Sequence, residues 1–476
     1  MAFYDLRDFL RLLESRGELH QIETVVDPSW EVGAICRENF DCDGPALQFN
    51  RVGTHRTPLI VGILGKKNLY GWALGVEPNF QAVYAKWQEA FRNPIKPVLV
   101  GTAPCKEVKL EKINLYEDPF PVPRWHVLDG GPYLGTFHLV IAKDPESGWI
   151  NCGMYRGQTL GKDRLGCQVL NPGQHLGTIL EKWRGLGKSM PVAVAIGVSP
   201  YLTLATVTKV PEGVDEYDIA GGLRGSPIEV VKAESSDLLV PACSEIVLEG
   251  EIRVDDFHPE EGPFGETPGY MGEKNTRVHY IQVKKITHRR DPLFQGTYEG
   301  KPPNESALVM LYTRTVSLYD HLLRSGVRGL RDVCVTYAGR GLHAVISIQK
   351  QYLGHARDVM SIVFRCPGLF CKHCVVVDED VDPWDAFQVE WAIATRVQAD
   401  RDVEIIKNAK STWFDVSQVP SRRPSSSWLG IDATKPVEEY TREGKEFPPS
   451  SDPPEELMKK VRARWKEYGF RDPRFI

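Results

Sequence analysis

The sequence contains no apolar run that approaches the roughly 20 residues an α-helix needs to cross a bilayer. Its start, MAFYDLRDFLRLLESRGELH, carries charges throughout and lacks the uninterrupted apolar segment of a secretory signal peptide. An excess of basic residues is also absent: the net charge is −5, whereas binding a phosphate backbone requires clustered Lys and Arg. We therefore expect a cytoplasmic protein with no membrane span and no nucleic-acid partner.

Cysteine is sparse. Ten cysteines in 476 residues make no disulfide framework, and in a reducing compartment most act as small buried apolar residues. Cys366 and the segment 371–374, CKHC, could form a metal site, but a structural zinc site needs a second ligand pair, and we find none at a recognisable distance. The segment continues into three valines typical of a buried strand, so we favour a structural role.

The composition is that of a globular protein, with 42% hydrophobic and 25% charged residues, and the length allows about three domains. Residues 5–16 place their apolar side chains on one helical stripe that Gly17 ends. An apolar strand-like run at 58–64 follows, which indicates an α/β unit. The segment 115–125, LYEDPFPVPRW, holds three prolines and is the first expected boundary.

Residues from about 130 to 310 have a different pattern, with short runs rich in β-branched residues between turn residues. Only 176–187 is clearly helical. The runs are TFHLVIA, VAVAIGV, IEVVKAE, EIVLEGEIRV and HYIQVKKIT. Many short strands at this spacing predict a barrel or a sandwich. After 310, helical segments again alternate with strands, which indicates a second α/β unit.

The C-terminal part separates into two pieces. Residues 417–454 are rich in Ser and Pro and are expected to run over the surface. Pro453-Pro454 then open an amphipathic helix, which could pack on a neighbouring subunit or on its own chain. The fold class expected is α+β and multidomain, with an N-terminal α/β domain, a β-rich central domain, a C-terminal α/β domain, and a linker with a helix. Their boundaries are 1–115, 116–310, 311–416 and 417–476.

Three separated side chains could hold a metal ion. Asn151 follows an apparent strand end, His175 starts a predicted helix, and Glu216 lies in VDEYDIAGGLRG. An amide oxygen, an imidazole and a carboxylate suit Mn²⁺ or Mg²⁺ with positions open for phosphate and water. Alternatively, His175 could cap its helix or lie on the surface, and Glu216 could be an exposed turn residue.

The segment EGPFGETPGY places Glu261 and Glu266 on a loop that can fold both inward, whereas a helix would set them ~140° apart. Arg156 could hold a substrate carboxylate through two hydrogen bonds, or form a structural salt bridge. A glutamate paired with this arginine stays ionised, and one in an apolar pocket has a raised pKa and can carry a proton. Two carboxylates also fit a glycosidase, which would leave the arginine and the metal set without a role.

These segments together resemble the UbiD family of decarboxylases over nearly the whole chain. The matching pieces are DLRDFLRLLESRGEL, Asn151-x-x-x-x-Arg156, Pro172-x-Gln174-His175, GGLRGSPIEVVKAESSDLLVPACSEIVLEGE and EGPFGETPGY. The resemblance implies prenylated FMN, made by a separate flavin prenyltransferase and bound in a central, flavin-reductase-like split β-barrel between α/β domains. It also implies a homo-oligomer, either a dimer or a hexamer.

The resemblance implies a role for each candidate. Asn151, His175 and Glu216 would hold the Mn²⁺ or Mg²⁺ that clamps the cofactor phosphate, with K⁺ near Glu216; Asp215 and Asp218 compete with Glu216 for that alignment. The cofactor-binding residues implied are Asn151, Cys152, Met154, Tyr155, Arg156, Gln174, His175 and Glu216.

For the reaction, the resemblance implies that Arg156 positions the substrate carboxylate, Glu261 orients Arg156, and Glu266 is the acid/base. The activity implied is reversible, non-oxidative decarboxylation of an aromatic or heteroaromatic acid through a covalent prenylated-FMN adduct, with release of CO₂. Phenolic, polycyclic, furan and pyrrole carboxylic acids stay open as substrates. An ordinary FMN-binding oxidoreductase and a non-catalytic subunit of a multi-component carboxylase are the alternatives.

Overall fold

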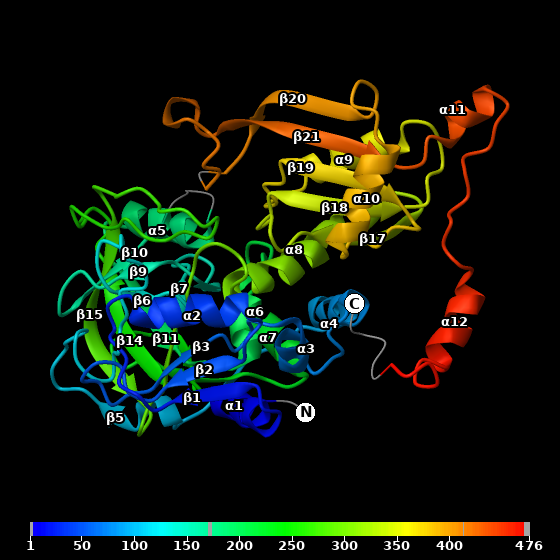
Figure 1. The fold of residues 1–476 in the computed structure, drawn as a ribbon. Coiled ribbons are helices and arrows are strands. Elements are labelled where there is room, and N and C mark those ends of the chain that lie inside the picture. Colours follow the sequence, from blue (N-terminus) through cyan, green and yellow to red (C-terminus); the bar gives the residue numbers. More distant parts are fainter. Residues whose placement is uncertain (1–2, 170–173, 413, 471–476) are drawn as a thin grey trace.

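The computed structural model describes residues 3–169, 174–412 and 414–470. A four-stranded mixed sheet and four helices form the N-terminal part (Figure 1). The helices are α1 (Leu6–Ser15), α2 (Glu31–Asp41), α3 (Lys67–Leu74) and α4 (Phe80–Arg92), and the strand order is β1 (Leu19–Ile22), β2 (Ala46–Phe49), β3 (Leu59–Val61) and β16 (Phe294–Gln295). The sheet thus includes β16, a strand from near the end of the central part of the chain.

Helix α1 confirms the amphipathic helix predicted at 5–16. The Asp5 carboxylate accepts a hydrogen bond of 2.9 Å from the Asp8 N–H and caps the helix. The four apolar side chains of the predicted stripe are all buried; they are Leu6, Phe9, Leu10 and Leu13. The local pattern therefore decided both the extent and the orientation of this helix.

The central part is built on a seven-stranded antiparallel sheet. The strand order is β10 (Arg164–Cys167), β15 (His279–His288), β14 (Ile246–Ile252), β11 (Met190–Ile196), β7 (His138–Lys143) and β8 (Ile150–Gly153), with β5 (Val108–Lys109) also paired to β15. The five predicted β-rich runs are the strands β7, β11, β14, β15 and, in a smaller sheet, β12 (Glu229–Lys232). The pairing path of these described strands does not close on itself, so the split β-barrel stays a prediction.

Both faces of this sheet are covered, as strand β11 shows. Ala193 and Ala195 belong to the apolar cluster shared with the N-terminal helices. Val192, Val194 and Ile196 belong to a second cluster on the other face. Side chains of a strand alternate between faces, so an almost continuous apolar run is the pattern of a strand buried on both sides.

Smaller elements complete the central part. A three-stranded sheet has the order β13 (Leu239–Pro241), β12 and β4 (Val98–Leu99). A two-stranded sheet pairs β6 (Tyr133–Gly135) with β9 (Gly157–Gln158). The helices are α5 (His175–Gly185), α6 (Pro200–Val207) and α7 (Glu216–Arg224). Helix α5 confirms the predicted helix at 176–187, but the expectation that it was the only clear helix here is wrong. Helix α6 is almost entirely apolar and buried, so it shows no helical period in the sequence.

Helix α7 escaped prediction because of its glycines. A Cβ at Gly221 would lie 2.3 Å from the Ile95 carbonyl oxygen, and one at Gly222 would lie 2.9 Å from the Ala90 Cα. The two glycines therefore allow α7 to pack closely on α4 and on the segment after it. Glycine lowers helix propensity by up to about 1 kcal/mol, and here tertiary packing outweighs that cost.

The C-terminal part is a five-stranded sheet with helices, as expected for an α/β unit. The strand order is β17 (Leu330–Val335), β18 (His343–Ile348), β19 (His373–Asp378), β21 (Ser425–Ala433) and β20 (Val403–Lys410), and the helices are α8 (Glu305–Arg324), α9 (His355–Phe364) and α10 (Ala386–Arg396). Cys366, Cys371 and Cys374 lie in its apolar core. Within the described part of the chain, no three or more His, Cys, Asp or Glu side chains are grouped as metal ligands.

Strand β21 corrects the expectation that residues 417–454 only run over the surface. It pairs in parallel with β19 and antiparallel with β20, so it is an inner strand of the sheet. Its first residues are serines, which hid the strand in the sequence. Backbone hydrogen bonds to both neighbours hold such a segment in the sheet whatever its side chains.

Figure 1 shows how the parts are joined. Helix α8 runs from the N-terminal and central parts to the C-terminal sheet, and α11 (Val437–Arg442) and α12 (Glu455–Ala463) extend away from that sheet. No residue of α12 is buried. None of the helices in the described ranges is long and apolar enough to cross a bilayer.

Candidate active site

The structure brings Arg156 into contact with both acids of the predicted loop. Arg156 lies between β8 and β9, and its guanidinium donates to Glu261 twice, from Nη2 to Oε2 at 2.6 Å and from Nε to Oε1 at 3.0 Å. Its Nη1 donates to Oε1 of Glu266. All three side chains are at least about nine-tenths buried. The loop therefore folds both carboxylates onto one arginine, as the sequence suggested.

Glu261 accepts hydrogen bonds from four donor groups. Besides the two from Arg156, the Tyr133 hydroxyl donates to Oε1 at 2.9 Å, and the Asn275 amide donates to Oε2 at 2.7 Å. Hydrogen bonds to the charged form favour it, and a bidentate arginine pair is the strongest arrangement of this kind. Glu261 is thus suited to orienting Arg156.

Glu266 is a different kind of carboxyl. Burial raises its pKa to about 6, against the opposing charge of Arg156, and the nearby carboxylate of Glu299 adds to the rise. A carboxyl with this pKa can hold a proton and release it near neutral pH. The two acids on Arg156 therefore differ: Glu261 accepts from four donor groups, and Glu266 has a pKa at which it can exchange a proton.

The loop between the two acids needs its glycines for close packing. A Cβ at Gly265 would lie 2.3 Å from the His126 ring, and one at Gly130 would lie 2.0 Å from the Gly262 carbonyl oxygen. Phe264, in the same loop, is buried, and its ring centroid lies 4.1 Å from that of Tyr133. Glycine at 265 and at 130 is thus required for the close packing of this loop against residues 126–130.

Asn151 and Glu216 also lie together. The Asn151 amide donates to Oε1 of Glu216 at 2.9 Å, and the Cys152 N–H donates to Oε2 at 2.8 Å. Oδ1 of Asn151 is buried and has no hydrogen-bond partner among the described residues. Burial raises the pKa of Glu216 to about 7. A buried amide oxygen without a donor, beside a carboxylate without a cation, fits a divalent metal ion.

Glu216, and not a neighbouring acid, makes this contact. The Asp215 carboxylate accepts instead from the Ile150 N–H at 3.1 Å, and Asp218 lies two residues beyond Glu216 in α7. Glu216 is the first residue of α7, which corrects the alternative of an exposed turn residue. The packing of α7 therefore decides which acid points at Asn151.

His175 is the third predicted ligand. It is the first residue of α5, and its ring lies against Trp149 with centroids 4.9 Å apart. Burial lowers its pKa, which favours the neutral imidazole that binds metals. In the portion of the chain that is described, no contact joins its ring to Asn151 or Glu216. Residues 170–173, which include Pro172 of the motif, lie outside the described residues.

The other predicted cofactor-binding residues line the gap between β8 and α5. Cys152 is buried within β8, and Met154 packs partly buried on the core. The Tyr155 hydroxyl accepts from the Leu176 N–H at 3.4 Å, and half-buried Gln174 is the residue before α5. The predicted residues thus lie in or next to β8, the last strand in the order of the central sheet, and at the start of α5.

Three domain families match the chain. They are the 3-octaprenyl-4-hydroxybenzoate carboxy-lyase N-terminal domain at residues 10–86, the Rift-related domain at 96–302 and the C-terminal domain at 307–433, the three domains of UbiD. The UbiD-class enzyme HmfF from Pelotomaculum thermopropionicum, solved in complex with FMN, is 36% identical with a TM-score of 0.85, covering 94% of this chain and 97% of HmfF.

The chain belongs to the UbiD family. Two further relatives agree in length and fold. An evolved dimeric form of HmfF with prenylated FMN is 35% identical, with a TM-score of 0.82 and coverage of 95% and 97%. The vanillic acid decarboxylase of Sedimentibacter hydroxybenzoicus in open form is 31% identical, with a TM-score of 0.86 and coverage of 98% and 100%. Members of the UbiD family are carboxy-lyases, and this chain is one of them.

Several residues around this UbiD site were not predicted. Tyr133 and Asn275 bind Glu261, Glu299 lies near Glu266, and Arg340 reaches Glu299 from the C-terminal part. None stands in a recognisable motif, and each is brought in by a separate strand or loop. Leu311, Tyr312 and Leu318 of α8 are buried in the core.

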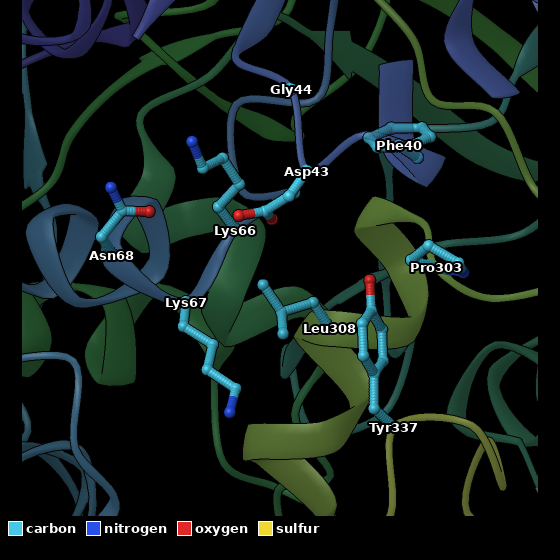
Figure 2. A pocket seen from close by; sticks show the side chains of 10 residues that line it. Phe40, Asp43, Gly44, Lys66, Lys67, Asn68, Pro303, Leu308 and Tyr337 are labelled. Carbon is cyan, nitrogen blue, oxygen red and sulfur yellow. The ribbon is translucent and has the colours of Figure 1, made fainter. Parts of the chain in front are cut away.

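Two cavities lie near the site in this UbiD-family chain. One, of about 450 Å³, is an open hollow that reaches Glu261 and Gly262 from outside. The other, of about 270 Å³, lies between the N-terminal part and the start of α8 and includes no predicted site residue. Figure 2 shows Lys66, Lys67 and Asn68 on one side of it and Leu308 and Tyr337 on the other.

Proposed function

We propose that this carboxy-lyase catalyses the reversible, non-oxidative decarboxylation of an aromatic or heteroaromatic acid, with Arg156, Glu261 and Glu266 as its reacting groups. The observation that supports the proposal most strongly is the unequal pair of carboxyls on one buried arginine. Glu261 accepts hydrogen bonds from four donor groups, and Glu266 has a pKa of about 6.

In this scheme Arg156 binds the substrate carboxylate, since a guanidinium offers two parallel donors to such a group. Glu261 fixes the plane of the guanidinium. Glu266, in its protonated form, donates its proton to the ring carbon after CO₂ has left, and in the reverse direction it removes that proton. Burial of the three side chains excludes water, which strengthens each electrostatic interaction.

The cofactor proposed is prenylated FMN, which when bound supplies the electron sink for loss of CO₂. Asn151, Glu216 and His175 would hold Mn²⁺ or Mg²⁺ at its phosphate, with K⁺ close to Glu216. The orphaned Asn151 Oδ1 and the buried Glu216 carboxylate support that assignment. A flavin prenyltransferase would supply the cofactor, as the resemblance implies.

The domain division at 1–115, 116–310, 311–416 and 417–476 and the split β-barrel of the central domain are proposed together with this function. We also propose a homo-oligomer. Helix α12 supports it, because its apolar side chains, including Leu457 with half of its surface exposed, contact little of their own chain. An evolved form of the HmfF relative is dimeric. A second copy of the chain is the natural partner for this helix.

The experiment that tests the function combines the released flavin with CO₂ release. The protein is purified anaerobically, with and without a co-expressed flavin prenyltransferase, and the flavin is identified by mass spectrometry. We expect prenylated FMN only with the prenyltransferase, and CO₂ release from an aromatic acid only in that sample. Plain FMN in both samples would favour an ordinary oxidoreductase, and no flavin in either would favour a non-catalytic subunit.

A further inference from the structure

His126 and Asp129 form a buried pair beside the loop that carries Glu266. The Asp129 side chain has no exposed surface, and that of His126 is 14% exposed. Nδ1 of the His126 ring lies 3.1 Å from Oδ2 and 3.2 Å from Oδ1 of Asp129. A carboxylate buried this completely needs partners that replace the water it has lost, so the contacts of Asp129 show what the pair does.

Asp129 holds the backbone next to Glu266. Its Oδ1 accepts a hydrogen bond of 3.0 Å from the Gly265 N–H, the amide directly before Glu266. Its Oδ2 accepts from the His126 N–H at 2.8 Å, and its carbonyl oxygen accepts from Nε of Arg124 at 2.9 Å. Asp129 is therefore fixed at both carboxylate oxygens and at its backbone, and one of these bonds leads directly to the chain at Glu266.

His126 ties the Asp129 carboxylate to a second segment of the chain. Its Nε2 lies 3.0 Å from the Glu299 carbonyl oxygen, which can only accept a hydrogen bond. Its Nδ1 faces a carboxylate, so both ring contacts are hydrogen bonds when the ring carries two hydrogens and forms an ion pair with Asp129. His126 thus joins the carboxylate that anchors Gly265 to the backbone at Glu299.

Packing adds to these hydrogen bonds. The Gly130 N–H donates to the Pro263 carbonyl oxygen at 2.7 Å. The His126 ring packs on Phe264 and on Tyr298, with ring centroids 5.7 and 4.7 Å apart. The segment that contains the pair therefore meets the active-site loop along a continuous contact.

Glu266 depends on its backbone for its position. Among the described residues, its carboxylate accepts a hydrogen bond from Arg156 alone. Its N–H donates to the Tyr270 carbonyl oxygen at 2.8 Å, and the preceding amide donates to Asp129. The place of the Glu266 carboxyl is thus set through the main chain on either side of it, and Asp129 supplies one of the two anchors.

We propose that His126 and Asp129 are positioning residues that hold Glu266 where it can transfer a proton to the substrate carbon. They act through the Gly265 N–H and not through Arg156, which binds the substrate carboxylate in the proposed scheme. A misplacement of about 1 Å at a reacting group can cost about 10²-fold in rate. The inference rests on the proposed function, because that function assigns proton transfer to Glu266.

Two variants test the pair. Asp129→Asn removes the charge that His126 and the Gly265 N–H bind. His126→Phe removes both ring hydrogen bonds but keeps an aromatic ring against its neighbours, so it tests the pair even if Asp129→Asn does not fold. The matched controls are Asp255→Asn and His20→Phe, which change the same residue types at exposed positions. Melting temperature and FMN content show whether each variant is folded and loaded.

The first measurement is amide hydrogen exchange of residues 261–272, followed by mass spectrometry on FMN-loaded protein. We expect this loop to exchange at least about threefold faster in both variants, because the Gly265 N–H loses its fixed acceptor and the loop opens more often. Exchange in α1 and in both controls should equal that of the wild type. An unchanged exchange rate of the loop in folded variants would overturn the proposal.

The second measurement separates positioning from a general loss of structure. With prenylated FMN and an aromatic acid that the wild type decarboxylates, kcat should fall at least about tenfold in both variants, and KM should change less than about threefold. In the Glu266→Gln background the same substitutions should change the residual kcat less than about twofold, because a positioning effect disappears with the group that is positioned. An equal fall of kcat in both backgrounds would overturn the proposal.

The two measurements also separate this inference from the proposed function. Faster loop exchange in both variants, with no CO₂ release from any aromatic acid by the wild-type protein loaded with prenylated FMN, would support the anchoring of the loop by His126 and Asp129. The same result would refute the decarboxylase function.

Discussion

Two buried glutamates in this protein, Glu266 and Glu216, differ in what lies beside them. Burial raises the pKa of both, to about 6 and about 7. Glu266 has the fixed cation Arg156 against it, whereas the side-chain and backbone partners described for Glu216 are the neutral amides of Asn151 and Cys152. A bound cation would favour the ionised form of Glu216, as Arg156 already does for Glu266. The proposed function therefore gives the same residue type two roles, proton transfer at Glu266 and metal binding at Glu216.

The largest effect is expected from Glu266→Gln. Glutamine keeps the shape but cannot supply the proton, so kcat for decarboxylation should fall about 10²–10⁴-fold, the range for a general acid. The rate of CO₂ release measures this fall in kcat, and the flavin content of the variant should equal that of the wild type. The control is Glu260→Gln, an exposed acid on the same loop paired with Lys274. Turnover near the wild-type rate in Glu266→Gln would show that another group delivers the proton.

Glu216→Gln tests whether Glu216, the other buried glutamate of the comparison, binds the metal ion. Removal of the negative charge should weaken Mn²⁺ binding by about 10–100-fold or more. Loss of a residue that only supports a metal ligand already lowers metal affinity by about 10–100-fold. Isothermal titration with Mn²⁺ in the presence of FMN measures it. Asp218→Asn on the same helix is the control and should bind as the wild type does. If Asp218→Asn were the weaker binder, the metal ligand would be misassigned.

Gly221→Ala tests whether the packing of α7 positions Glu216. The added Cβ would lie 2.3 Å from the Ile95 carbonyl oxygen, so α7 must shift. We expect the free energy of unfolding to fall by about 1–3 kcal/mol, as for other overpacked sites, with weaker Mn²⁺ binding. Urea unfolding measures the loss. Gly185→Ala in α5, where a Cβ meets nothing within 4 Å, should be neutral or slightly stabilising. Equal stabilities of the two variants would contradict this account.

The smallest expected effect is a pH dependence of stability from Glu266. Its pKa of about 6 in the folded protein exceeds the ordinary 4.5, so the folded state binds this proton more tightly than the unfolded state. The resulting stabilisation is fully present below pH 4.5 and is lost as the pH rises through 6; it amounts to about 2 kcal/mol, at 1.36 kcal/mol per pKa unit. The difference in unfolding free energy between wild type and Glu266→Gln, measured from pH 4.5 to 7.5, should fall by that amount. A constant difference would mean that Glu266 has an ordinary pKa.

Prediction from the sequence succeeded where the signal was local. Helix α1 and the strands β7, β11, β14 and β15 follow from periodicity alone, and the two acids of one loop were predicted to meet Arg156. It failed at α6, α7 and β21, where apolar, glycine-rich and serine-rich segments take their structure from neighbours. Local propensity is a weak prior that such contacts override.

The order of the amino acids alone was enough to name the candidate groups of the site: an arginine, two glutamates and an amide–imidazole–carboxylate set, with a loop flexible enough to bring the two acids inward. It could not show which partners each glutamate has. Tyr133 and Asn275 donate hydrogen bonds to Glu261, while burial and then Glu299 raise the pKa of Glu266. These partners lie far away in the chain. A pKa depends on desolvation and on nearby charges, and both exist only once distant segments have packed together.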